Sequence, residues 1–245
     1  MLSLSIVLPA YNEHARLPST LDRILEYVSS RSFSFLEILV VDDGSLDGTA
    51  ETVRGYGDRS PLIRLISNPG NRGKGFAVRH GMLKARGDWR LFTDADLSAP
   101  IEDLEKLFDA AAREHAVISF GSRALDRSLV SVPQGWSREM SGRLFNVIVR
   151  LVTGLPHHDT QCGFKLYRAD AAEAVFGRQK LDGFGFDVEA LFIARRLGLK
   201  AVEVPVRWAN VEGTRVSLAS GLRAFLDLLL IRRYDWRGDY RLGAD

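Results

Sequence analysis

Two aspartates stand one residue apart directly after an apolar run, in the segment TDAD at residues 93–96. Asp94 and Asp96 would point to the same side of a strand or flank a turn, which brings their carboxylates close together. Two like charges at that distance repel, whereas a hard divalent cation reverses the sign of the local field. Mg²⁺ or Mn²⁺ takes oxygen ligands and leaves coordination positions for the phosphates of a substrate. The pair thus predicts a metal site or, taken alone, a solvated turn.

Polar residues and glycines follow five apolar runs in the first half of the chain, in the segments PAYNE, DDGS, NPGNRGKG, DAD and GSR. The runs predict strands, and amphipathic segments between them predict helices. Strands of continuous apolar character that alternate with helices indicate an α/β fold, with a mostly parallel central sheet and helices on both faces. Ligands of such sheets bind beyond the carboxyl ends of the strands, so these segments predict one shared site.

The second half of the chain is less regular. Its patterns predict helices over 138–153, 169–176 and 186–197, strands at 162–168 and 201–208, and a last helix over about 215–233. No linker rich in Pro, Gly or Ser and no repeat interrupts the chain. We therefore expect one domain over residues 1–210, followed by an amphipathic, basic C-terminal extension over 211–245.

Composition excludes several classes of protein. A chain of 245 residues can bury a substantial core, and its net charge of +2 gives no sign of nucleic-acid binding. Cys162 is the only cysteine, which rules out an intramolecular disulfide and fits a reducing compartment. The N-terminus reads as a strand rather than a signal peptide, and no apolar run approaches the roughly 20 residues that span a bilayer. We expect a cytoplasmic protein.

The glycine-rich segments do not match the common nucleotide-binding motifs. PAYNEHARL contains no glycine where a dinucleotide fold needs G-x-G-x-x-G, and GNRGKGF lacks the spacing and the Ser or Thr of a P-loop. Glycines at 70, 73 and 75 instead permit a tight turn near a ligand, with Lys74 available to an anionic group.

Six ordered segments carry a resemblance to a known family: SIVLPAYNE, EILVVDDGSLDGT, NPGNRGKGFAVRHGM, GDWRLFTDADLS, GSR and DTQCGFKLYR. Over about residues 4–210 the chain resembles a family 2 glycosyltransferase with the GT-A fold. The particular resemblance is to dolichyl-phosphate mannose and glucose synthases and their bacterial polyprenyl-phosphate relatives.

The resemblance implies a site for a nucleotide-sugar donor. It places Pro9, Tyr11 and Glu13 in the nucleotide pocket, and Asp43 or the adjacent Asp42 at the base. It places Asp94 near the sugar diphosphate and makes Asp96 the principal ligand of Mn²⁺ or Mg²⁺. It also makes three residues of the segment HDTQCGFK part of the floor of the site: Asp159, Gln161 and Lys165. Lys74 completes the expected donor contacts.

The sugar and the acceptor follow from the same resemblance. Mannose synthases usually continue D-A-D-L-Q, whereas Ser98 stands here in place of the glutamine, which favours UDP-glucose over GDP-mannose. Arg123 and Arg138 fall where the family binds the lipid phosphate, and guanidinium groups suit phosphate oxygens. The mannose-synthase pattern R-x-x-x-S-x-x-x-N is only partly kept, since Gly142 holds the serine position and Ser141 lies beside it. Either arginine alone is equally consistent with a surface ion pair.

Two further features stay open. Asp187 and Glu189 begin a predicted helix, where acids are common, or lie by the sugar or acceptor. The last helix has an apolar stripe that ends in Arg232 and Arg233, which suits core packing or a membrane surface with anionic lipid. With a lipid acceptor we expect a peripheral protein on the cytoplasmic face of the membrane, with room for a small membrane-anchoring partner.

The predicted reaction is an inverting transfer of a hexose from a nucleotide diphosphate to a polyprenyl phosphate. A phosphate monoester has a second pKa of about 6, so the acceptor is already anionic and needs positioning more than a general base. A sugar-hydroxyl acceptor is the alternative reaction, with Asp187 or Glu189 as the base. A regulatory module that binds a nucleotide sugar without catalysis is the alternative outside enzymes.

Overall fold

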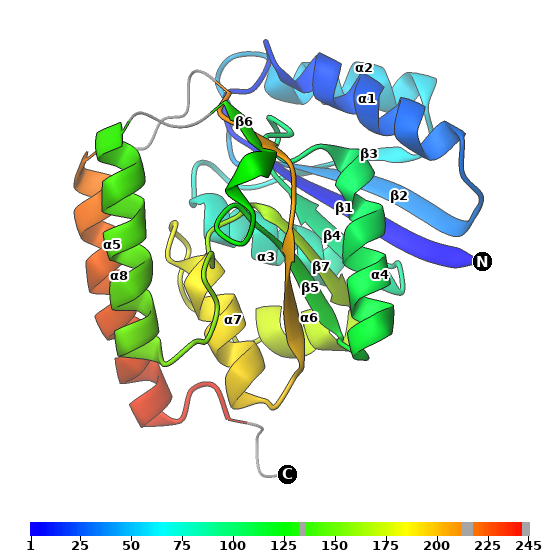
Figure 1. The fold of residues 1–245 in the computed structure, drawn as a ribbon. Coiled ribbons are helices and arrows are strands. Elements are labelled where there is room, and N and C mark those ends of the chain that lie inside the picture. Colours follow the sequence, from blue (N-terminus) through cyan, green and yellow to red (C-terminus); the bar gives the residue numbers. More distant parts are fainter. Residues whose placement is uncertain (133–135, 212–217, 242–245) are drawn as a thin grey trace.

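The structure is a computed structural model that describes residues 1–132, 136–211 and 218–241, without the side chains of 136–139, 141, 143 and 218–224. The first half alternates strands and helices (Figure 1): β1 Leu2–Ala10, α1 Leu17–Ser29, β2 Phe33–Asp42, α2 Thr49–Arg59, β3 Ile63–Ser67, α3 Lys74–Lys84, β4 Trp89–Thr93, α4 Leu104–Glu114 and β5 Ile118–Ser122. The second half contains β6 Val130–Val132, α5 Trp136–Thr153, β7 Phe164–Arg168, α6 Ala169–Phe176, α7 Phe186–Arg196, β8 Ala201–Pro205, β9 Trp208–Ala209 and α8 Leu218–Arg237.

The central sheet has seven strands in the order β3-β2-β1-β4-β7-β5-β8. All neighbours are parallel except β7, which runs antiparallel to both β4 and β5. Because β7 runs the other way, its first residue, Phe164, pairs with Thr93 at the end of β4. The segment before β7 therefore reaches the same edge of the sheet as the TDAD segment. The predicted mostly parallel α/β fold is confirmed.

Helices cover both faces of this sheet (Figure 1). Leu4, Ile6 and Leu8 of β1 pack with α1, α2 and α4 on one face, whereas Val7 packs with α3, α6 and α7 on the other. This alternation follows from the two-residue period of a strand, and both sides are apolar because both faces are covered.

Helices α5 and α8 lie side by side outside the second layer (Figure 1), and the rings of Phe145 and Phe225 meet edge to face with centroids 5.2 Å apart. Their inner residues Val149, Leu228 and Ile231 join the core under α7. No helix within the described ranges has the length and hydropathy that a bilayer crossing requires.

Three local features go beyond the sequence-based expectations, and each has a physical cause. Strands β6 and β9 pair into a small ribbon, and segments this short carry no readable alternation. Pro100 opens a 3₁₀ turn, Ile101–Asp103, before α4 begins. Helix α8 continues to Arg237 because Tyr234 packs against the core and Asp235 pairs with Arg196 of α7.

Helix α3 lies close to the sheet because Gly81 faces it. A Cβ atom there would come within 2.4 Å of Val7 Cγ1 and 2.8 Å of Val41 Cγ2. We expect Gly81→Ala to destabilise the fold by about 1–3 kcal/mol through overpacking. Gly55→Ala on α2 has no atom within 4 Å of the new methyl group and is the matched control. It should raise stability by about 0.5–1 kcal/mol. Urea unfolding measures both, and equal effects would contradict the close approach of α3.

Candidate active site

The loops after β1 and β2 are tied together at the carboxyl edge of the sheet. The backbone amide of Asn12 donates to Ser45 Oγ at 2.8 Å, and the side-chain oxygen Oδ1 of Asn12 accepts from the backbone amide of Leu46 at 2.8 Å. The backbone amide of Glu13 donates to Thr49 Oγ1 at 2.9 Å. Asn12 adopts the left-handed region at φ 55°, which asparagine tolerates better than most residues. The first two polar segments of the sequence thus form one wall.

The predicted nucleotide contacts lie on this wall in different environments. Pro9 is buried within β1, whereas 37% of Tyr11 is exposed. The Glu13 carboxylate pairs with Arg16 at 2.7 Å. Asp42 is buried at the end of β2, where one carboxylate oxygen accepts from the Ser45 amide at 3.2 Å. These residues share the edge of the sheet, and the exposed ring of Tyr11 is the part open to a ligand.

Asp43 anchors the glycine-rich loop that follows β3. Its carboxylate accepts from Asn68 Nδ2 at 2.8 Å, from the Gly73 amide at 2.7 Å and from the Arg72 amide at 3.1 Å. Gly73 has φ +106°, and a Cβ atom there would lie 2.4 Å from the carbonyl oxygen of Asp182. The loop therefore needs glycine at that position. Sequence reasoning missed Asn68, whose role depends on a contact across strands.

Lys74, at the start of α3, pairs with Asp94 at 2.7 Å. Burial alone would lower the pKa of Lys74, but the carboxylates of Asp94 and Asp187 outweigh it and raise the pKa, so the lysine stays charged. Asp94 packs over Gly163, where a Cβ atom would lie 2.1 Å from Asp94 Oδ2. The fold thus gives Asp94 a cationic partner and a backbone floor.

Asp96 occupies a turn beyond β4. The turn is closed by the Leu97 amide, which donates to the Asp94 carbonyl at 3.2 Å, and Leu97 itself has φ 46°. A non-glycine residue in this region costs about 1–2 kcal/mol, and partial burial of Leu97 against the core offsets it. The Ser98 amide donates to Asp96 Oδ1 at 3.0 Å. The two aspartates therefore flank a turn instead of continuing the strand.

The donor set at this turn suits a hard divalent cation. Asp96 is partly exposed, and no side chain in the described residues forms an ion pair with it. The same part of the chain contains no group of three or more His, Cys, Asp and Glu residues arranged to hold a metal. A cation here would rest on one or two carboxylates and on ligand phosphates, which is the usual environment of Mg²⁺.

Arg123, directly after β5, forms a two-point ion pair with Asp159. Nε lies 2.6 Å and Nη2 lies 2.8 Å from the carboxylate oxygens, and the Arg123 amide also donates to Asp159 at 3.0 Å. Burial would raise the pKa of Asp159, but Arg123 overcomes it and holds that pKa below its usual range. The pair therefore stabilises the fold at neutral pH and loses this contribution below about pH 4.

The floor of the site contains a second buried pair. Lys165 is 1% exposed, and its Nζ donates to the Cys162 carbonyl at 2.6 Å and to Asp187 at 2.5 Å. Burial raises the pKa of Asp187, an effect that Lys165 only partly opposes. Gln161 is partly exposed, and its backbone amide donates to the Asp159 carboxylate at 3.2 Å. Lys165 thus supports the site from below, whereas Gln161 reaches its surface.

Glu189 is fully buried and holds a loop. It accepts from the Lys180 and Leu181 amides at 2.9 and 2.8 Å and from the Tyr240 hydroxyl at 2.7 Å. This loop packs on Gly75, whose Cβ position lies 2.6 Å from the Leu181 carbonyl oxygen. Sequence reasoning did not single out Tyr240. In this structure both acids are buried and have partners, Asp187 with Lys165 and Glu189 with this loop and Tyr240.

The predicted acceptor residues are only partly placed. Arg123 lies at the edge of the sheet beside Trp208, with its guanidinium carbon 5.5 Å from the ring centroid. Arg138 and Ser141 fall within α5, but their side chains lie outside the described residues.

The fold resembles those of two solved synthases. Glucosyl-3-phosphoglycerate synthase from Mycobacterium tuberculosis, in complex with Mn²⁺, uridine-diphosphate and glucosyl-3-phosphoglycerate, has a TM-score of 0.69 at 22% identity, covering 94% of this chain and 80% of that one. Mannosyl-3-phosphoglycerate synthase from Rubrobacter xylanophilus has a TM-score of 0.69 at 18% identity, covering 100% and 77%. The covered sheet with an acidic turn at its carboxyl edge has the GT-A fold.

Sequence comparison identifies the family. The model of Glycosyl transferase family 2 matches residues 5–176, and the chain belongs to this family. It is 38% identical over 255 residues to dolichyl-phosphate beta-glucosyltransferase of Mus musculus, covering 98% of this chain and 78% of the relative. The enzyme of that name in Drosophila melanogaster is 37% identical over 244 residues, covering 94% and 74%. The predicted membership is confirmed, and the chain is a hexosyltransferase.

The two adjacent aspartates differ in their contacts, which predicts different costs of substitution. Asp43→Asn replaces an acceptor of several hydrogen bonds with an amide that presents donors to donors. It should destabilise the protein by about 2–3 kcal/mol. Asp42→Asn, the matched control, can keep its single hydrogen bond from Ser45 through the amide oxygen and should cost less than about 1 kcal/mol. Thermal unfolding compares the two, and a smaller loss for Asp43→Asn would refute the anchoring role.

Proposed function

We propose that this protein transfers glucose from UDP-glucose to a polyprenyl phosphate of the dolichyl phosphate type, with inversion at the sugar. The observation that carries the proposal is the identity of 33–38% to proteins named dolichyl-phosphate beta-glucosyltransferase, over nearly the whole chain. Ser98, which replaces the glutamine of the mannose synthases, supports the same sugar. Its amide contacts Asp96, so the substitution lies at the acidic turn itself.

The donor would bind along the carboxyl edge of the sheet. We assign the nucleotide to the wall formed by Pro9, Tyr11 and Glu13, with the base read by Asp42 or Asp43. Because the Asp43 carboxylate already anchors the loop before α3, Asp42 has more freedom to contact a base. Lys74 and Gln161 are assigned to the diphosphate and sugar, with Asp94 oriented by Lys74 and Lys165 supporting them from below.

Asp96, with Asp94 beside it, would hold Mn²⁺ or Mg²⁺. A bound divalent cation supplies charge neutralisation for the leaving diphosphate. The pairing of Asp94 with Lys74 leaves Asp96 as the principal ligand. Complexes with Mn²⁺ among solved structures of this fold support a divalent ion, and both metals remain within the proposal.

The reaction joins two bound anions in line. An oxygen of the acceptor phosphate forms the bond to C1 of glucose as the bond from C1 to the β-phosphate oxygen breaks, and UDP leaves with that electron pair. The acceptor oxygen is already ionised, so the step needs no proton transfer. Arg123 is held by Asp159 through Nε and Nη2, and its Nη1 has no hydrogen-bond partner among the described residues, which leaves that group for the acceptor phosphate. Arg138 and Ser141 are assigned to the same phosphate.

The burial of Asp187 and Glu189 disfavours a sugar-hydroxyl acceptor, because that nucleophile requires an accessible base. GDP-mannose is the alternative donor. We further propose that the protein is peripheral on the cytoplasmic face of a membrane, where its acceptor would lie, with residues 211–245 contributing to the contact. A small membrane-anchoring partner is compatible with this arrangement.

The direct test incubates the protein with polyprenyl phosphate, Mn²⁺ and either UDP-[¹⁴C]glucose or GDP-[¹⁴C]mannose. We expect label in the organic phase with UDP-glucose only. Label with GDP-mannose alone would overturn the assignment of the donor. Binding of UDP-glucose without transfer or hydrolysis would instead indicate a non-catalytic module.

Asp96→Asn should lower the transfer rate on the order of 100-fold or more, because it removes the proposed metal ligand. Asp88→Asn is the matched control, an exposed aspartate at the opposite end of β4. The control should retain full activity. In the same assay, the Mn²⁺ concentration that gives half-maximal activity should rise for Asp96→Asn only. Unchanged activity of that variant would refute the metal role.

Arg123 has two separable roles in this proposal. Arg123→Gln leaves Asp159 as a buried uncompensated charge and should cost about 3–5 kcal/mol of stability. Arg123→Gln combined with Asp159→Asn removes that charge and should recover most of the stability. We expect the double variant to keep only a low transfer rate, with a raised KM for the polyprenyl phosphate. Recovery of activity in the folded double variant would show that Arg123 serves only the fold.

A further inference from the structure

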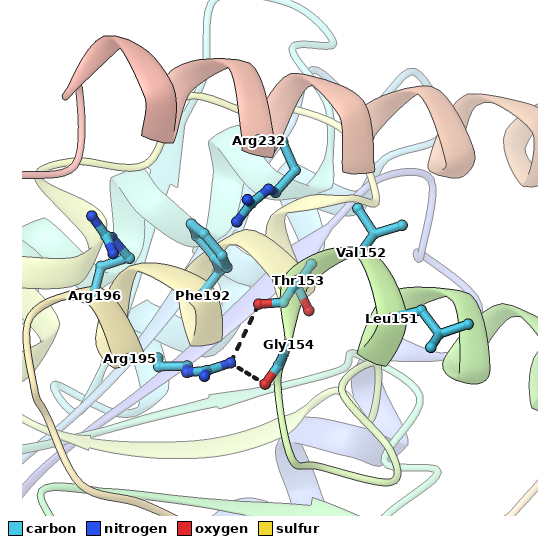
Figure 2. Close-up of a pocket in the computed structure, with 8 residues that line it drawn as sticks. All are labelled: Leu151, Val152, Thr153, Gly154, Phe192, Arg195, Arg196 and Arg232. Carbon is cyan, nitrogen blue, oxygen red and sulfur yellow. Dashed lines mark hydrogen bonds between the residues drawn. The ribbon is translucent and has the colours of Figure 1, made fainter.

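A pocket of about 400 Å³ lies where the ends of α5 and α7 meet α8. Its lining residues are distant in sequence from the acidic turn. Figure 2 shows Arg195 and Arg196 reaching it from α7 and Arg232 from α8. Its remaining lining is uncharged: Leu151, Val152, Thr153, Gly154 and Phe192. The pocket contains none of the residues assigned to the donor or acceptor, so the proposed transfer does not account for it.

The charges around this pocket do not cancel. Asp235 is the acid nearby, 2.8 Å from Arg196 Nε and 3.7 Å from Arg232 Nη1. Arg195 donates to the carbonyl oxygens of Thr153 and Gly154 at the end of α5 (Figure 2). Asp235 therefore pairs with two of the three guanidinium groups, and about half of the Arg196 and Arg232 side chains is exposed. An excess of fixed, partly exposed guanidinium charge is suited to a phosphate group.

Helix α5 presents an exposed apolar stripe that ends at the mouth of the pocket. The stripe consists of Met140, Leu144, Val147 and Leu151, which are 45%, 60%, 41% and 79% exposed. Spacings of four, three and four residues place them on one side of the helix, opposite the buried Phe145 and Val149. Leu151 belongs both to this stripe and to the pocket lining.

Helix α8 continues the same apolar character beside α5. Among its described side chains, the exposed large apolar ones are Phe225, Leu226, Leu229 and Trp236, whereas Leu228 and Ile231 face the core. Arg232 lies between Leu229 and Trp236 along the helix and leans into the pocket (Figure 2). Apolar residues with an interspersed arginine and a tryptophan near the end are typical of helices in the plane of a membrane interface.

We propose that the pocket binds the phosphate of an anionic phospholipid headgroup while the two stripes rest in the interface. The occupant is a lipid surface because the positive pocket adjoins exposed apolar side chains on two helices, a combination that matches an anionic headgroup above acyl chains. The inference rests on the proposed function only in that a lipid acceptor brings the protein to a membrane. It adds a second lipid site, distinct from the acceptor phosphate at Arg123.

Sedimentation of the full chain with vesicles tests this inference without any sugar donor. We expect binding to phosphatidylcholine vesicles that contain about a third phosphatidylglycerol, and much weaker binding to phosphatidylcholine alone, at physiological salt. Leu151→Gln should weaken binding several-fold, whereas Leu46→Gln, at a loop residue 90% exposed elsewhere, should not. Equal binding to both vesicles, or no effect of Leu151→Gln, would overturn the proposal.

Substitutions of Arg232 and Arg233 distinguish binding of a headgroup in the pocket from diffuse electrostatic attraction to the membrane. Both are exposed on α8, but only Arg232 lines the pocket. Loss of one basic residue near an anionic surface costs about fivefold in affinity by diffuse attraction, which is the result expected for Arg233→Gln. Arg232→Gln should cost tenfold or more because it also loses the phosphate contact. Equal losses would refute the pocket.

Two controls keep this result apart from folding and from the transfer reaction. Both arginine variants should keep the thermal unfolding temperature of the parent. Both should also keep the transfer rate toward a short polyprenyl phosphate in detergent, because neither contacts the proposed site. Saturable binding to a protein partner, competing with vesicles and abolished by Leu151→Gln without any anionic-lipid preference, would overturn the lipid as occupant.

Discussion

The neutralisation of carboxylates at one edge of the sheet is the constraint on which the rest of the site depends. Several acids converge there, and the fold gives the buried ones separate partners. Asp43 accepts hydrogen bonds from backbone amides. The other three form ion pairs: Asp94 with Lys74, Asp159 with Arg123 and Asp187 with Lys165. Without these partners the acids would repel each other in a medium that screens charge poorly. Among the described residues, Asp96 is the acid of this group that is left for a cation from outside.

Two of the buried acids, Asp43 and Glu189, also fix loops. The Asp43 contacts set the turn that delivers Lys74, and Glu189 sets the loop that packs over Gly73 and Gly75. Loops at the end of a parallel sheet would otherwise be free to move, because few backbone hydrogen bonds join them to the strands. The same carboxylate contacts therefore neutralise charge and hold the loops in place. A substitution that removes one of these acids changes both the charge of the site and the position of a loop.

The antiparallel strand β7 is the topological device that completes the edge. It inserts between β4 and β5, so the segment from Asp159 to Gly163 enters the site beside TDAD. On the far side of the second layer, α5 and α8 expose apolar stripes and a basic pocket. Helix α5 begins with the positions assigned to the acceptor phosphate and ends at that pocket. Helix α5 would thereby fix how the site of transfer is oriented relative to the membrane surface.

The alternation of strands and helices can be read from the sequence alone, and so can the polar segments at five strand ends and the family. These signals are local, since apolar periodicity and short motifs are read without knowing which segments touch. The sequence therefore predicted correctly that the DAD segment lies at the carboxyl edge of a mostly parallel sheet. The roles of its site residues stay predictions, and the side chains of Arg138 and Ser141 lie outside the described residues.

Which charged groups pair with each other depends on the three-dimensional fold. The pairing of Lys74 with Asp94, the burial of Glu189 against Tyr240 and the anchoring of Asp43 by Asn68 join residues from different elements. So does the pocket between α5, α7 and α8, whose three arginines have no shared motif. Such contacts depend on the order and direction of the strands and on helix packing. No local pattern encodes them, because each residue is compatible with several partners until the fold selects one.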